Sequence, residues 1–104
     1  MRRILSLFRR RPDPTAELRA RLEVREQEMR RRAAELLRLA ANGASGRSRD
    51  CLLFHAAAAD ARAKALHSAL GGDAVAAVDL TLEAEYLDRL AAQASLEPVE
   101  AAHA

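Results

Sequence analysis

The chain has 104 residues, enough for one small domain, and its 17 basic and 15 acidic side chains leave a formal net charge of +2. Its single Cys excludes a disulfide scaffold, its four Gly exclude a collagen-like chain, and its length excludes a large α/β enzyme. Ala, Leu, Arg and Glu dominate, as is typical of helices, and no alternating run bounded by turn residues predicts a strand. We therefore expect an all-α protein.

The two halves of the chain differ in charge. Residues 1–49 carry fourteen basic and six acidic groups (14 − 6 = +8), and residues 50–104 carry three and nine (3 − 9 = −6). This asymmetry predicts either an anionic partner for the first half or pairing between the two halves. The lone Cys and the lack of any apolar run near the ~20 residues that span a bilayer indicate a cytoplasmic location, with peripheral membrane attachment as an option.

The chain opens with a short basic stretch in residues 1–12, of which residues 1–11 are called the basic segment below. Its apolar residues are Ile4, Leu5, Leu7 and Phe8. Arginines on both sides of an apolar patch are typical of a short amphipathic helix in a membrane interface, where each contributes ~1 kcal/mol near an anionic surface. The residues expected to bind such a surface are Arg2, Arg3, Ile4, Leu7, Phe8, Arg9, Arg10 and Arg11. The alternative is that the segment folds back on the remaining helices as a small extra helix.

A long, highly charged helix is expected in residues 13–43. Asp13 and Pro14 are good N-cap and first-turn residues, and Asn42-Gly43 is a good stop, so the helix should run from Pro14 to about Ala41. Its narrow apolar stripe includes Leu18, Leu22, Met29, Ala33, Leu36 and Ala40. The spacing of Leu22, Met29 and Leu36 is typical of a coiled coil, but arginines occupy the positions of the second stripe. Favourable ion pairs are predicted for Glu17–Arg21, Glu26–Arg30 and Glu28–Arg32.

This long helix is expected to bind a partner. Leu18, Leu22, Met29 and Leu36 would supply buried area, whereas Arg25 and Arg32 would set register or select an acidic partner. The expected partner is another protein or a second copy of this chain. An anionic membrane surface and nucleic acid are the alternatives, with nucleic acid less favoured because acidic residues interrupt the basic ones.

An antiparallel, Ala-rich helical hairpin is expected in residues 49–97, after a loop at 42–49 and before a flexible tail at 98–104. The first helix should run from about Asp50 to Leu70 and the second from Ala74 to about Leu96, where Glu97-Pro98 would end it. Both helices show two apolar faces. A helix with two such faces is usually central, so the sequence predicts that the second helix lies in the middle of the protein. A three-helix bundle and a dimeric helical assembly both fit this pattern.

The second face of the last helix consists of Val75, Val78, Leu82 and Tyr86. The predicted core is small, because Ala side chains bury little area each. A chain with such a core often gains stability by forming oligomers or by docking on a partner.

Two groups of polar residues have side chains of the kinds found in reactive sites. Cys51 and His55 share a helix face but lack the further ligands of a structural zinc site, so we interpret them as a buried Cys beside a His on a helix face. The carboxylates Asp79, Glu83, Glu85 and Asp88 lack a Glu-x-x-His motif, and we expect Asp79 and Glu83 to face the arginines of the long helix.

No nucleotide-binding or hydrolase motif occurs in the sequence. We therefore expect no catalysis, no cofactor and no metal. The expected function is that of a small helical interaction, adaptor or assembly protein, with a membrane tether in the basic segment as an option. The alternative is a nucleic-acid-associated regulator that uses the arginine-rich first half.

Overall fold

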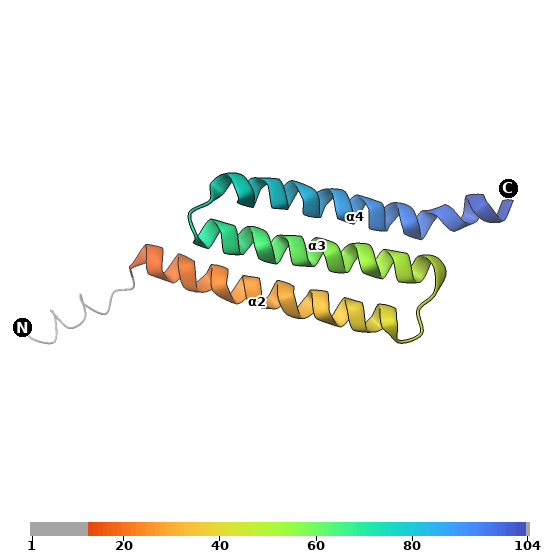
Figure 1. Ribbon diagram of the computed structural model, residues 1–104, viewed down its shortest axis with the longest axis horizontal. Coiled ribbons are helices and arrows are strands. Elements are labelled where there is room, and N and C mark those ends of the chain that lie inside the picture. Colours follow the sequence, from red (N-terminus) through yellow and green to blue (C-terminus); the bar gives the residue numbers. More distant parts are fainter. Residues whose placement is uncertain (1–12, 104) are drawn as a thin grey trace, which may run out of the picture.

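The computed structural model describes the backbone of residues 13–103 and the side chains of residues 13–95. Within this range the protein is all-α, as predicted, with three helices and no strand. The helices are α2 (Pro14–Ala41), α3 (Gly46–Leu70) and α4 (Ala74–His103). The chain reverses direction at both turns, so that α3 returns beside α2 and α4 returns beside α3 (Figure 1).

The ends of α2 and the start of α4 follow the local signals in the sequence. Asp13 Oδ1 accepts a hydrogen bond from the backbone N–H of Thr15 at 3.1 Å, and Pro14 occupies the first turn of α2. Asp73 Oδ1 accepts one from the backbone N–H of Ala76 at 3.0 Å. Gly72 reverses the chain between α3 and α4 with φ +84°, a value that favours glycine.

Two boundaries differ from the prediction. Helix α3 starts at Gly46, so only residues 42–45 connect it to α2, although residues 42–49 were predicted to be a loop. A short connection is the usual one between neighbouring antiparallel helices, and this outweighs the low helix propensity of the residues that precede Asp50. Helix α4 continues through Glu97-Pro98, where the sequence predicted its end and a flexible tail. A proline removes one backbone donor, which weakens a helix but does not have to end it.

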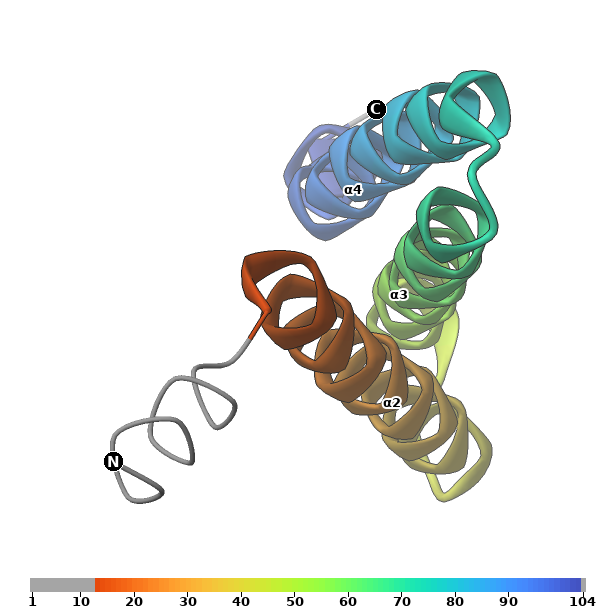
Figure 2. The ribbon, with the colours of Figure 1, turned by 90° about the vertical axis from the view of Figure 1, so that its left-hand side faces the viewer.

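Helix α3 is the central helix, and the prediction that the last helix is central was wrong. Both α2 and α4 pack on α3, and no Cα–Cα approach within 8 Å links α2 to α4. Seen along the helices, α2 and α4 lie on different sides of α3 and are both tilted toward the same face of it (Figure 2). The two apolar faces of α3 are therefore both used inside the chain, whereas α4 uses one.

The core consists almost entirely of alanine. Six alanines of α3 are buried (Ala56, Ala58, Ala59, Ala61, Ala63 and Ala65), as are Ala84, Ala91 and Ala94 of α4. Leu36 of α2 is the one buried hydrophobic residue larger than Ala among the described side chains. Because Ala contributes a single methyl group, the helices can approach closely, but each contact removes little apolar area from water.

Candidate interaction surface

The basic segment, for which an anionic partner was predicted, lies outside the described residues. The second predicted surface, on α2, is largely used inside the chain. Leu36 is buried, Leu22 and Met29 are half-buried, and Leu18 is 56% exposed. Since α2 packs only on α3 among the described helices, the apolar stripe of α2 mainly forms the α2–α3 interface. Arg25 and Arg32 are exposed beside this stripe.

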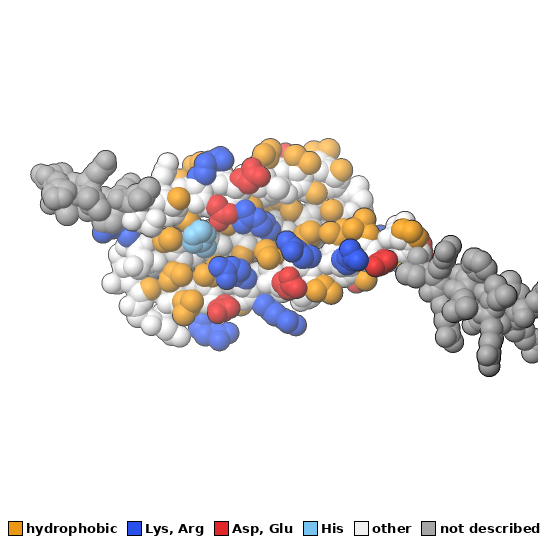
Figure 3. All heavy atoms as spheres, turned by 180° about the vertical axis from the view of Figure 1, so that it is seen from behind, with side chains coloured by type: hydrophobic (Ala, Val, Ile, Leu, Met, Phe, Trp, Pro, Cys, Tyr) orange, Lys and Arg blue, Asp and Glu red, His pale blue; other side chains and the backbone are white. Residues whose placement is uncertain are grey.

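A groove of about 270 Å³ runs over α3 between α2 and α4. Its floor includes Ala65, Leu66 and Ala69 of α3, and its sides include Met29 of α2 and Ala77 and Thr81 of α4. Arg25 and Arg62 also line it, so the groove combines an apolar floor with positive charge. From behind, several basic side chains lie across the middle of the molecule among apolar and acidic ones, and further basic side chains lie at its upper and lower edges (Figure 3).

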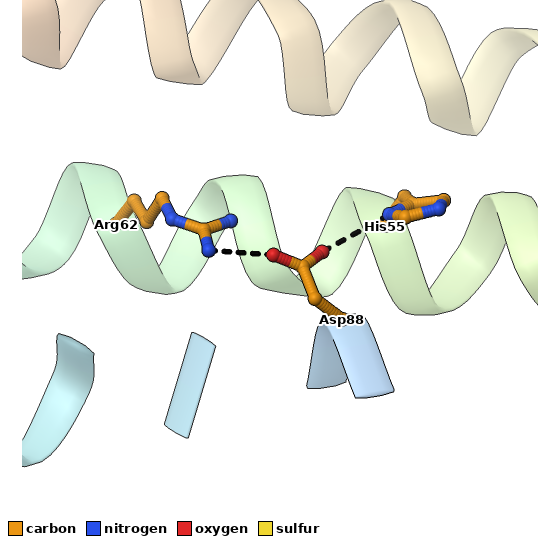
Figure 4. Close-up of polar contacts among 3 residues, drawn as sticks. All are labelled: His55, Arg62 and Asp88. Atoms are coloured by element: carbon orange, nitrogen blue, oxygen red, sulfur yellow. Dashed lines mark hydrogen bonds and ion pairs between the residues drawn. The ribbon is translucent and has the colours of Figure 1, made fainter. Parts of the chain in front are cut away.

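Asp88 links α4 to α3 through a cluster of three polar side chains. Arg62 Nη2 donates a hydrogen bond to Asp88 Oδ2, and His55 Nδ1 lies 3.0 Å from Asp88 Oδ1 (Figure 4). Arg62 and His55 both project from α3, two turns apart, so one carboxylate connects two points of the neighbouring helix. This contact therefore connects α4 to α3 in addition to their apolar packing.

The environment of Asp88 lowers the pKa of its carboxyl group below the ordinary value. Burial alone would raise this pKa, because it disfavours the charged form. The hydrogen bonds from Arg62 and His55, together with the positive charges of these two groups, outweigh burial. Asp88 is therefore a structural anion that is neutralised within the chain.

The structure also shows where Cys51, His55 and the acidic residues of α4 lie. His55 contacts Asp88, and Cys51 is half-buried, so the expectation of a buried Cys was wrong. Within residues 13–95, no group of three or more His, Cys, Asp or Glu side chains is placed to hold a metal ion. The expectation that Asp79 and Glu83 face the arginines of α2 was wrong, because α4 does not reach α2 and both side chains are exposed.

Helix α4 carries the most continuous exposed apolar surface of the described chain. Val75, Val78, Leu82 and Tyr86 are 74%, 58%, 56% and 53% exposed, and we call these four residues the outer stripe. They recur every three or four residues, so they form one line about 16 Å long on the side of α4 that faces away from buried Ala84. Apolar side chains lie over this part of α4 at the upper edge of Figure 3.

The outer stripe is bordered mainly by negative charge. Asp79, Glu83 and Glu85 are exposed on the same stretch of α4. The one basic residue nearby is Arg89, whose guanidinium carbon lies 5.9 Å from the centre of the Tyr86 ring. The outer stripe therefore fits a partner that is both apolar and basic.

Sequence reasoning found the residues of the outer stripe but not the long-range polar contacts. The Asp88–Arg62 pair joins residues 26 positions apart, and the partly buried Glu26 is met by Arg30 at 3.0 Å and by His67 at 3.4 Å. Of the three i,i+4 ion pairs predicted from the sequence, Glu17–Arg21 and Glu26–Arg30 are confirmed. The predicted Glu28–Arg32 pair does not form among the described side chains, whereas Asp60 and Lys64 form a pair of this spacing on α3.

Comparisons with protein-family models, with curated proteins and with solved structures give no match. A search of the described helices for a stretch able to cross a membrane also finds none that is both long and apolar enough. Function must therefore be argued from the surface of the helices.

Proposed function

We propose that the protein is a non-catalytic helical interaction protein, of the adaptor or assembly type, and that the outer stripe of α4 is its docking surface. The observation that carries the proposal is the contrast between the stripe and the core. Large apolar side chains lie in a line on the surface, while the buried hydrophobic positions of the described chain are Ala with the single exception of Leu36.

This contrast is unfavourable for the stability of the chain as a monomer. A core of alanines buries little apolar area, and at about 25 cal/mol per Å² its contribution to folding is limited. The outer stripe adds exposed apolar surface that no part of α2 or α3 covers. Contiguous exposed apolar residues bordered by charge are typical of protein–protein contact sites. Docking of a partner on α4 would supply the buried area that the chain lacks.

Site-specific photo-crosslinking tests the proposal. A benzophenone amino acid replaces Leu82 in the full chain, and the cells that make the protein are irradiated. A matched control carries the same amino acid in place of Leu37, which is 50% exposed on α2 and lies outside the stripe. We expect discrete adducts from position 82 and none of the same mass from position 37. No adduct at position 82, or the same adducts at both positions, would contradict the proposal.

A further inference from the structure

We propose that the outer stripe of α4 binds the basic segment, residues 1–11, of a second copy of this chain. The inference rests on the proposed function, since it assigns an occupant to the docking surface named there. It follows from the charge, the length and the chain geometry of the two elements.

The two elements are opposite in charge and alike in apolar character. The basic segment carries five arginines and no acidic residue around Ile4, Leu5, Leu7 and Phe8. The outer stripe is flanked by three carboxylates, and its one neighbouring arginine already lies against Tyr86. Two α4 helices packed on each other would instead bring their carboxylates together, which is unfavourable. Charge therefore favours the basic segment over a second α4 as the occupant.

The two elements also match in length. The outer stripe extends from Val75 to Tyr86, about 16 Å at 1.5 Å per residue. Eleven residues in the predicted amphipathic helix would extend about 16 Å as well. One helix of this length would cover the whole stripe, which the exposed carboxylates of Asp79, Glu83 and Glu85 border.

The segment must come from another copy. Only Pro12 and Asp13 separate the basic segment from the start of α2, and two extended residues span at most about 7 Å. The outer stripe lies on the far side of α4, with α3 between α2 and α4. Because α2 and α4 do not contact each other, their axes are farther apart than the about 8–10 Å between two packed helices. This separation exceeds the reach of the linker. Two copies related by a twofold axis would form this contact twice, which closes the assembly as a dimer.

Sedimentation of the full chain over a range of concentrations gives the first arm of the test. We expect a dimer that weakens when salt is raised to about 1 M, where the Debye length is roughly 3 Å. Val78→Glu should weaken it by about tenfold or more, because a charge enters the apolar contact. Val24→Glu is the matched control, since Val24 and Val78 are both 58% exposed. It should leave the dimer unchanged.

A charge exchange between copies identifies the occupant. One variant carries Arg9→Glu and Arg10→Glu, and the other carries Glu83→Arg and Glu85→Arg. Each variant alone should remain a monomer, because its N-terminal segment and its outer stripe then carry charges of the same sign. The mixture should form a heterodimer. In one contact the acidic segment of the first variant meets the basic stripe of the second, and in the other the native segment meets the native stripe. The circular dichroism of both variants should match that of the native chain.

Three results would overturn the inference. A native chain that stays a monomer removes the second copy as occupant. A dimer that Val78→Glu weakens but that the mixture does not restore shows that another surface covers the outer stripe. The third result combines two observations on Leu7→Glu. The variant no longer floats with anionic phosphatidylserine vesicles, yet it sediments like the native chain, which shows that the basic segment binds a membrane instead. In each of these three cases, a crosslink from position 82 to a different protein would still support the outer stripe as the docking surface. Failure of this inference is therefore distinguishable from failure of the proposed function.

Discussion

Helices α3 and α4 both have two apolar faces, but the protein uses them differently. On α3 both faces are Ala-rich and both are buried, against α2 and against α4. On α4 one face is buried through Ala84 and Ala91, while the other presents Val, Leu and Tyr side chains to solvent. On these two helices the buried positions are alanines, and the large exposed side chains of α4 lie where no helix of the described chain follows.

The difference shows how a second apolar face should be interpreted. Such a face predicts a contact, but it does not say whether the contact lies within the chain. For α3 the contact is supplied by α2 and α4. For α4 it is left open, and we propose that another chain supplies it. Changes on the two helices should therefore affect different quantities, namely the free energy of unfolding for α3 and the association constant for α4.

The largest effect on unfolding is expected inside the α3–α4 interface. Ala58 is fully buried against Ala84, so Ala58→Leu should lower the free energy of unfolding by about 1–3 kcal/mol through overpacking. Urea-induced unfolding measures this loss. The control is Ala57→Leu at an exposed neighbouring position, which should change stability by less than about 0.5 kcal/mol. Equal stabilities of the two variants would show that α3 and α4 do not pack closely.

A smaller effect is expected at the polar contact between the same helices. Asp88→Asn removes a partly exposed carboxylate that meets Arg62 and His55, and should cost about 1 kcal/mol near neutral pH. The pKa of Asp88 is lowered in the folded protein, so its stabilisation is present above the ordinary Asp pKa, about 3.9, and is lost as pH falls through the folded value. Unfolding measured from about pH 2 to 7 should show a weaker acid dependence in the variant. An unchanged acid dependence would contradict this role for Asp88.

The smallest effect on unfolding is expected on the outer stripe. Val78→Glu changes an exposed side chain, so the free energy of unfolding of the single chain should shift by less than about 0.5 kcal/mol. The measurement must be made at low protein concentration, because association stabilises the folded chain by mass action. A loss comparable to that of Ala58→Leu would show that Val78 packs within its own chain.

Local structure was predictable because its signals are local. The start of α2 at Pro14, its end at Ala41 and the start of α4 at Ala74 follow from capping residues and turn glycines next to them. The start of α3 at Gly46 was missed, because the shortness of the connection outweighs the composition of the residues around it.

Contacts between distant residues were not predictable in this way. Which helix lies in the centre depends on how three helices pack, and the apolar pattern of α4 alone suggested the wrong one. The pair between Asp88 and Arg62 depends on the alignment of α4 along α3, which no spacing within either helix encodes. The outer stripe was visible in the sequence as a second face, but its exposure follows only from the placement of α4 beside a single neighbour.

Cysteine labelling tests the central claim, that a second copy covers the outer stripe, most directly. In a Cys51→Ala background, which removes the native thiol, Leu82→Cys reports on the stripe and Leu37→Cys on an exposed position of α2. The account predicts that the thiol at position 82 reacts more slowly as protein concentration rises, while the thiol at position 37 reacts at a constant rate. Equal rates at position 82 across all concentrations would contradict it.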